Sequence, residues 1–377
     1  MKIYIPKFVT VFVGLFLFSS LFVPHGFASK DLRVETKKRL QIVRSVSLNP
    51  TKSDINKYNL KRSKIWNFFL TSKRITLPIL ERELKAEIEK KDKNDFFLLE
   101  VGHFLFLQGS TVQKNKAVQA LYSIDASKIS KSFNFNKLFN FTYRVSKERY
   151  PGILAFIDGA FLSKVKQRVV ISKGSVNLDN TMICVFLYGA YGPDSENHLL
   201  KSISNPLNKQ RVIEVLTWVG SEQSVIQVKK TISQETDYAL LTSALTYLLQ
   251  NGGSEGLQVV RELNTNKFDK DLRNFYDRIQ KAARMMSLES LTARYSRHPG
   301  KLEYSDQELK LRLSHMYDNG RLDRQLNPLA IINSKLPKHV LLLELGKIRH
   351  KIFSKISNQG IGDIQFINAL MNTIQFR

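Results

Sequence analysis

Apolar residues recur with the spacing of an α-helix in three successive units between positions 180 and 263. In the middle unit they fall at i, i+3, i+4 and i+7, and the pattern resumes after a short polar turn. Each unit therefore predicts two antiparallel helices. The expected core positions are Ile183, Phe186, Leu187, Ala190, Leu199, Leu200 and Ile203, then Val212, Val215, Leu216, Val219, Val225, Val228 and Ile232, then Leu240, Leu241, Ala244, Leu245, Leu248, Leu257, Val260 and Leu263.

The turns within the three units share glycine and a Ser-Glu pair. We expect Gly220 to take the left-handed conformation that ends a helix, and Ser221 to accept hydrogen bonds from the first N–H groups of the next helix. The Ser-Glu pairs begin at Ser195, Ser221 and Ser254, so the offsets are 26 and 33 residues. Unequal offsets indicate a degenerate repeat.

These hairpins resemble HEAT or armadillo-type helical repeats over about residues 180–263, with a weaker fourth copy at 97–124. The usual Asp and Arg of consensus HEAT units are not evident. The resemblance implies an α-solenoid, because a two-helix unit buries its apolar face only against stacked neighbours. The alternative is a non-repetitive helical domain whose hairpins look alike by chance.

The remaining patterns favour an all-α fold. Further helices are expected at 268–288, 306–316, 340–353 and 361–376, and the last of these should close the array. Only 168–176 alternates in a way that could form a strand.

Residues 1–28 have the pattern of an export signal. Lys2 and Lys7 precede an apolar run, and a small-x-small site ends at Ala28, where we expect cleavage. An uncleaved membrane anchor is the alternative, although the run is shorter than a comfortable span. Cys184 is the single cysteine, so neither an internal disulfide nor a lipoprotein anchor is expected, and we predict that it is a small buried side chain.

The mature chain divides by composition into three regions. Residues 29–59 form a basic lead-in that we expect to be partly flexible, and 60–150 an N-terminal helical region. Residues 151–377 form the helical-repeat region with C-terminal capping helices. Pro151-Gly152 is the clearest break between the last two regions.

The chain is strongly basic, with a formal net charge of +25. Residues 29–75 hold thirteen Lys and Arg against three acids, and 131–150 interleaves aromatic residues with cations. Such a segment either packs its aromatics inward and its cations outward, or binds an anionic ligand. The candidate anion- or partner-binding residues are Lys131, Lys137, Arg144, Lys147, Arg149, Lys164, Lys166 and Arg168.

No catalytic template fits the sequence. There is no His-Glu-x-x-His, no nucleophile elbow, no P-loop and no Gly-rich dinucleotide turn, so we expect no catalytic residues, no cofactor and no metal. A helical, exported and basic chain leaves one enzymatic alternative, a cell-envelope glycan (peptidoglycan) hydrolase with a divergent active site. That enzyme needs a catalytic Glu buried beside a groove, and the sequence identifies none.

We therefore expect a periplasmic or secreted scaffold or adaptor without enzymatic activity. It should bind a protein partner through its helical-repeat surface, while its basic faces contact an anionic membrane surface or envelope polymer. Nucleic acid is not expected as a partner of an exported protein.

Overall fold

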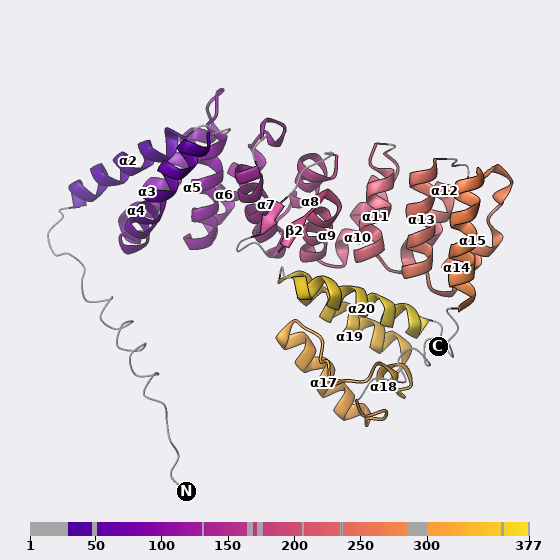
Figure 1. The fold of residues 1–377 in the computed structure, drawn as a ribbon. Helices are drawn as coiled ribbons and strands as arrows, with labels where there is room; N and C mark the ends of the chain where they lie inside the picture. The colour runs from indigo at the N-terminus through magenta and orange to yellow at the C-terminus, as the bar shows by residue number, and fades with distance from the viewer. Residues whose placement is uncertain are drawn as a thin grey trace, which may run out of the picture. The chain divides into compact units, whose positions relative to one another are not determined.

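The computed structural model describes residues 29–46, 51–129, 132–163, 169–171, 176–205, 207–233, 235, 237–285, 300–355 and 358–375. The expected export signal, 1–28, lies outside these residues. The chain forms two compact units, 1–137 and 138–377, and each is considered by itself. Both are helical (Figure 1), which confirms the all-α prediction.

The first unit is built from helices that pack as neighbours along the chain. They are α2 (Ser29–Arg44), α3 (Lys52–Thr71), α4 (Lys73–Ile88), α5 (Asp95–Gln108), α6 (Thr111–Tyr122), the 3₁₀ turn η1 (Ala126–Lys128) and the first part of α7 (Ser132–Lys147). The α5–α6 pair is the weaker fourth hairpin of the sequence pattern, and Ser110 between its helices forms a capping box with Gln113.

The basic lead-in, 29–59, which we expected to be partly flexible, is helical over Ser29–Arg44 and from Lys52 onward. In α2, Thr36, Leu40 and Val43 are completely buried, at spacings of four and three residues. Helix α3 begins at a capping box between Thr51 and Asp54. The high density of basic residues obscured this narrow apolar stripe, because the lysines and arginines occupy the rest of each helix surface.

The second unit begins within α7 and continues to the C-terminal region. Its elements are α8 (Ile153–Ile157), the π-helical turn η2 (Asp158–Leu162), β1 (Val169–Ile171), β2 (Val176–Leu178), α9 (Asn180–Tyr191), α10 (Asp194–Ser202), α11 (Lys209–Val219), η3 (Glu222–Ser224), α12 (Val225–Ile232), α13 (Tyr238–Asn251), α14 (Gly253–Glu262), η4 (Thr265–Lys267), α15 (Lys270–Met285), α17 (Asp306–Asn319), α18 (Pro328–Ile332), α19 (Lys338–Phe353) and α20 (Asn358–Gln375).

Helices α9 to α14 form the three hairpins expected from the sequence. Helix α11 contacts α9 and α13, and α13 contacts α15, so the first helices of successive hairpins form a row. The second helices, α10, α12 and α14, pack beside them (Figure 1). Nearly all the expected core positions are buried; the exceptions, Leu200 and Leu263, are half-buried. The helical periodicity thus identified both the hairpins and their inner faces.

The turn chemistry was predicted only in part. Ser221 accepts a hydrogen bond from the Gln223 N–H, as expected for a helix start. Gly220, however, is extended, with φ −74° and ψ 177°, so the left-handed prediction is wrong. Glycine is needed there for a different reason: a Cβ atom would lie 2.6 Å from the Leu216 carbonyl oxygen.

Helices α19 and α20 do not close the end of the row but cross the edge where the hairpins turn (Figure 1). Helix α19 contacts α9, and α20 contacts α11, α13 and α14. At the end of α11, Leu216 O accepts from the N–H of the capping residue Gly220, while the carbonyl groups after it lie beyond the last helical hydrogen bond. Side chains from other helices donate to this end: Asn251 to Leu216 O and Thr217 O, Asn368 to Trp218 O, and Arg349 to Val219 O and Gly220 O.

The same mode of docking recurs along this edge. His350 Nδ1 donates to Gly189 O at the end of α9, at 2.8 Å. Asn372 donates to Leu249 O at the end of α13 and accepts from the Gly253 N–H. Successive residues of α19 and α20 therefore supply the caps that three hairpins lack.

Two further expectations concern the middle of the chain. The boundary between the two units falls inside α7, between Lys137 and Leu138, and not at Pro151-Gly152. That dipeptide is a corner, where Arg149 and Gly152 have positive φ. The segment 168–176, singled out as a possible strand, contributes to the antiparallel pair β1–β2.

Cys184 is fully buried, and burial raises its pKa to about 12, in agreement with the prediction of an inert, packed thiol. In the part of the chain that the structure describes, no helix has both the length and the apolarity needed to cross a membrane.

Candidate functional site

Among the described residues of 131–150, four aromatic side chains face inward, and three cations near the end of the segment face outward. Phe135, Phe139, Phe141 and Tyr143 are buried, whereas Arg144, Lys147 and Arg149 are exposed. The Tyr143 hydroxyl donates to Phe353 O at 2.7 Å, which ties α7 to the end of α19. The buried aromatics are therefore part of the packing, and only the cations remain for a ligand.

The eight candidate residues separate into three groups. Lys131, Lys164, Lys166 and Arg168 lie outside the described residues. Lys137 belongs to the first unit, where its ammonium group pairs with Glu100, which also accepts from Arg62 at 3.2 Å. The remaining three, Arg144, Lys147 and Arg149, lie together at the end of α7 in the second unit.

Lys137 is a structural cation. Its side chain is 15% exposed and lies over the rings of Tyr58 and Phe96, at 5.6 and 5.1 Å. Burial lowers the pKa of Lys137 well below its ordinary value, and the charge of Arg62 acts in the same direction. With Glu100 only 4% exposed, this group of charges links α3, α5 and α7 and offers no open anion site.

Two lysines join these three cations: Lys351 in the last turn of α19, and Lys355 two residues after that helix ends. Lys147 Nζ donates to Ser354 O at 3.0 Å, Lys355 Nζ donates to Asn319 O at 2.7 Å, and Lys351 Nζ lies 5.2 Å from the Tyr317 ring centroid. We call Arg144, Lys147, Arg149, Lys351 and Lys355 the basic cluster. Three helix ends, those of α7, α17 and α19, meet there.

The positive charges of the basic cluster influence one another, as the pKa of Lys147 shows. Burial lowers the pKa of Lys147. The positive charges of Arg144, Lys351 and Lys355 lower this pKa further. Like charges this close disfavour one another's charged forms, so a bound anion would relieve the repulsion.

Acidic partners do not neutralise the basic cluster. Arg149 lies 3.6 Å from the exposed Asp194, and Glu148 is nearby. Among the described residues, Arg144 has no ion pair. Cations near the C-terminal end of a helix also interact favourably with its partial negative charge, and this accounts for part of their placement. Five cations near two carboxylates still leave an excess of positive charge on this surface.

The sequence pointed to three of the five residues of the basic cluster. Arg144, Lys147 and Arg149 stand out in the aromatic and basic segment, but Lys351 and Lys355 were not singled out. The available signal was the basic last turn of α19, which holds His350 and Lys351. Nothing in the local pattern indicated that this turn lies beside α7, about 200 residues earlier in the chain.

A second polar cluster centres on Asp158 in the π-helical turn η2. It accepts from the Tyr188 hydroxyl, lies 2.8 Å from His198 Nε2 and accepts from Ser202 Oγ at 3.1 Å. Burial, and then the Asp158 charge, raise the pKa of Tyr188 well above its ordinary value. Ser202 bonds the carboxylate and not the imidazole, so this is no nucleophile-base pair. The cluster joins η2, α9 and α10.

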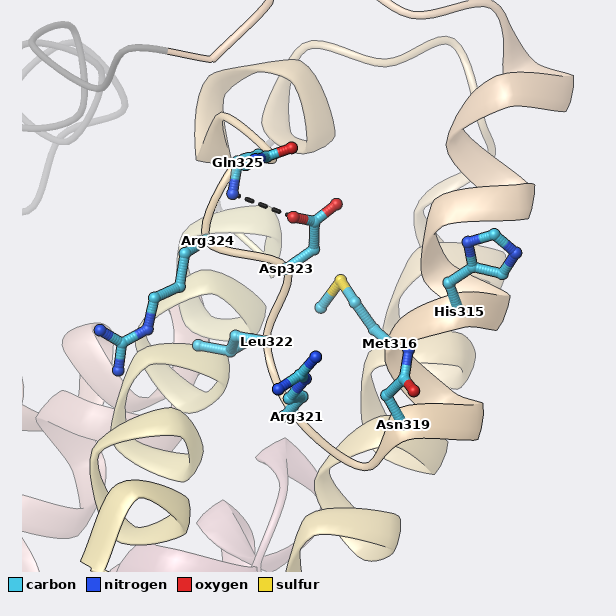
Figure 2. Close-up of a pocket in the computed structure, with 8 residues that line it drawn as sticks. All are labelled: His315, Met316, Asn319, Arg321, Leu322, Asp323, Arg324 and Gln325. Carbon is cyan, nitrogen blue, oxygen red and sulfur yellow. Dashed lines mark hydrogen bonds between the residues drawn. The ribbon is translucent and has the colours of Figure 1, made fainter. Parts of the chain in front are cut away.

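The loop after α17 encloses a pocket of about 390 Å³ (Figure 2). Asp323 in this loop pairs with Arg312 at 2.7 Å and accepts from the Gln325 N–H. Figure 2 shows Arg324 extending away from Met316, so the cations of the loop do not converge. The described residues contain no group of three or more His, Cys, Asp or Glu side chains that could hold a metal ion.

Comparisons with known proteins add no further constraint. The chain matches no protein-family model, no curated protein and no solved structure.

Proposed function

We propose that this protein is an exported scaffold without enzymatic activity, in which a HEAT/armadillo-like α-solenoid binds a protein partner and the basic cluster holds an anionic envelope surface. The observation that carries the proposal is the convergence of Arg144 and Lys147 with Lys351 and Lys355 on one surface. A cluster of this kind is attracted to anionic headgroups by about 1 kcal/mol for each cation near the surface.

The row of hairpins supports the scaffold part of the proposal. Repeated helical hairpins present extended surfaces, and such surfaces are used mainly for binding. One edge of the row is covered by α19 and α20, so a protein partner would use the sides of the hairpins that these two helices leave open. Export rests on the charge and apolar pattern of residues 1–28.

The described glutamates do not supply the catalytic acid of a glycan hydrolase. That enzyme needs a buried carboxyl group that is free to donate a proton. Among the described residues, the buried glutamates are Glu87, Glu100 and Glu196, and each is held by other groups: Glu87 by Arg44 and Lys90, Glu100 by Arg62 and Lys137, and Glu196 by Ser221 and Ser224.

The test measures binding to lipid vesicles. The protein is mixed with vesicles of phosphatidylcholine alone or with anionic phosphatidylglycerol, and bound protein is separated by flotation. In the cluster variant Arg144, Lys147, Lys351 and Lys355 are changed to Gln. With four contacts removed, we expect binding to anionic vesicles to weaken by at least about tenfold.

A matched control removes the same charge elsewhere. Lys270, Lys281, Lys310 and Lys335 are exposed residues of the same unit, and changing them to Gln gives the same net charge. We expect this control to bind anionic vesicles nearly as well as the unmodified protein. Equal losses in the two variants would mean that overall charge alone drives binding, and the basic cluster would lose its assigned role.

A further inference from the structure

A cavity of about 430 Å³ lies between α11, α13 and α20. Its volume falls in the range of small-molecule sites. Trp218 of α11, Gln250 of α13 and Gln365 of α20 contribute to its wall, so three separate helices build it. It lies at the edge where α20 caps the hairpins, and it is distinct from the basic cluster.

The lining of this cavity carries no ionisable group, although the chain has a net charge of +25. The polar lining residues are hydroxyl and amide side chains: Thr217, Thr246, Gln250, Gln365, Asn368 and Asn372. An anionic or cationic ligand would find no counter-charge there. A neutral ligand with many hydrogen-bonding groups fits this lining.

Some of these polar groups are already used by the protein. Asn368 donates to Trp218 O and accepts from Arg349, and Asn372 donates to Leu249 O and accepts from the Gly253 N–H. These bonds fix both asparagines in place, so they form a rigid wall. They are spaced four residues apart on α20 and are not available to pair with the backbone of an extended peptide.

Other polar groups of the cavity lining remain available to bond a ligand. Gln250 and Gln365 are exposed, and no hydrogen bond is formed by either side chain among the described residues. Each amide offers two donor hydrogens and an acceptor oxygen. The hydroxyls of Thr217 and Thr246 donate to Ile213 O and Thr242 O, and their lone pairs can still accept.

Trp218 adds an apolar surface to this polar set. Its side chain is half-buried and lines the cavity. The face of an indole ring carries negative charge density, which attracts the weakly positive C–H groups on one side of a pyranose ring. Hydroxyl groups around the edge of the same sugar match the amides of Gln250 and Gln365.

From these observations we infer that the cavity between α11, α13 and α20 is a binding site for a neutral saccharide. Trp218 packs against a sugar ring, and Gln250 and Gln365 bond its hydroxyl groups. This inference goes beyond the proposed function and does not depend on it, since it involves neither the basic cluster nor a protein partner.

The test uses Trp218 as its own reporter. The chain contains two tryptophans, and Trp66 lies in the first unit, so the Trp66→Phe variant leaves only the tryptophan of the cavity. This variant is titrated with three neutral trisaccharides: the N-acetylglucosamine trimer, cellotriose and maltotriose. At least one should change the Trp218 emission saturably with a Kd of about 1 mM or tighter, and calorimetry on the unmodified protein should give the same Kd.

Substitutions identify the site. Gln250→Ala and Gln365→Ala should each weaken saccharide binding by about fivefold, because each removes hydrogen bonds to the ligand. Both residues are exposed on helices, where Ala is well tolerated, so the unfolding midpoint should not fall. Gln258→Ala is the matched control: Gln258 is exposed on α14, and its side chain bonds Glu262, outside the lining of the cavity, so saccharide binding should be unchanged.

Three results would overturn the inference. The first is the absence of saturable binding by any of the three sugars up to about 10 mM. The second is binding that Gln250→Ala and Gln365→Ala leave intact. The third is tighter binding by a neutral Gly-Ser hexapeptide than by all three sugars, which would make the cavity a peptide site.

Discussion

Arg349 is the residue whose loss should most disturb the docking of the C-terminal helices. Its guanidinium group donates to Val219 O at 3.0 Å, to Gly220 O at 3.1 Å and to Asn368 Oδ1 at 2.8 Å. Val219 and Asn368 are 7% and 8% exposed, so water reaches these acceptors poorly. One side chain therefore holds α19, α20 and the end of α11 together.

The substitution Arg349→Met keeps most of the apolar stem and removes every donor. A buried acceptor that loses its partner costs about 1–3 kcal/mol. Three acceptors are affected, but the site is half-buried and some water can enter. We therefore expect the second unit to lose about 3 kcal/mol of stability, which lowers its urea midpoint by about 1 M or more.

The assay again uses Trp218, because Trp218 O accepts from Asn368 and its side chain lies where α20 docks. Urea unfolding is followed by Trp218 emission in a Trp66→Phe background, so the first unit does not contribute. Arg349→Lys retains the charge but not the planar fork, and its midpoint should lie between those of Arg349→Met and the parent.

The matched control is Lys347→Met on the same helix. Lys347 is exposed and pairs with Glu344 on the same helix, at 2.7 Å, so its loss should change stability by no more than about 0.5 kcal/mol. If Arg349→Met unfolds at the same urea concentration as Lys347→Met, the caps do not hold α19 and α20 in place, and the account of this edge is wrong.

Two further predictions concern the same edge. Gly189→Ala should destabilise the second unit by about 1–3 kcal/mol, because the new Cβ would lie 2.5 Å from the Phe353 ring. Gly346→Ala, also in a helix but with open space around it, should stabilise the unit by about 0.5–1 kcal/mol. If the two variants shift the thermal unfolding temperature in the same direction, the packing described at Gly189 is wrong. The pKa of His350 is lowered from 6.5, first by burial and then by nearby cations including Arg149, so the unfolded chain protonates first as pH falls. The stability present above about pH 6.5 should then decline below it. The decline in urea midpoint from about pH 7.5 to about pH 5.5 should be smaller in His350→Gln, which keeps a donor for Gly189 O but does not titrate; equal declines would exclude His350 as a cause.

Local patterns predicted the helices well and the site only in part. The hairpins of α9 to α14 follow from apolar residues at helical spacing, and the end of α17 follows from Gly320, which is left-handed as a helix-ending glycine should be. The helix α2 was missed because its buried stripe is narrow. Three residues of the basic cluster were identified, because Arg144, Lys147 and Arg149 stand in one conspicuous segment, whereas Lys351 and Lys355 stand in an unremarkable one.

The sequence by itself determined most of the helical segments from position 60 onward, which of their faces are apolar, and that the chain carries a large excess of positive charge. Only the tertiary structure decided which contacts the turns of the hairpins make. Glu196 of one Ser-Glu turn accepts from Ser221 of the next, and Gly189 admits the ring of Phe353.

The physical reason is the range of the interactions. Helical periodicity depends on residues three and four positions apart, so a short window of sequence records it. The bonds from Arg349 to Gly220 and from Tyr143 to Phe353 join residues 129 and 210 positions apart. Such contacts depend on how whole helices pack, and no local pattern encodes them. The basic cluster and the cavity between α11, α13 and α20 both arise where α19 or α20 meets earlier helices, so both exist only in the folded chain.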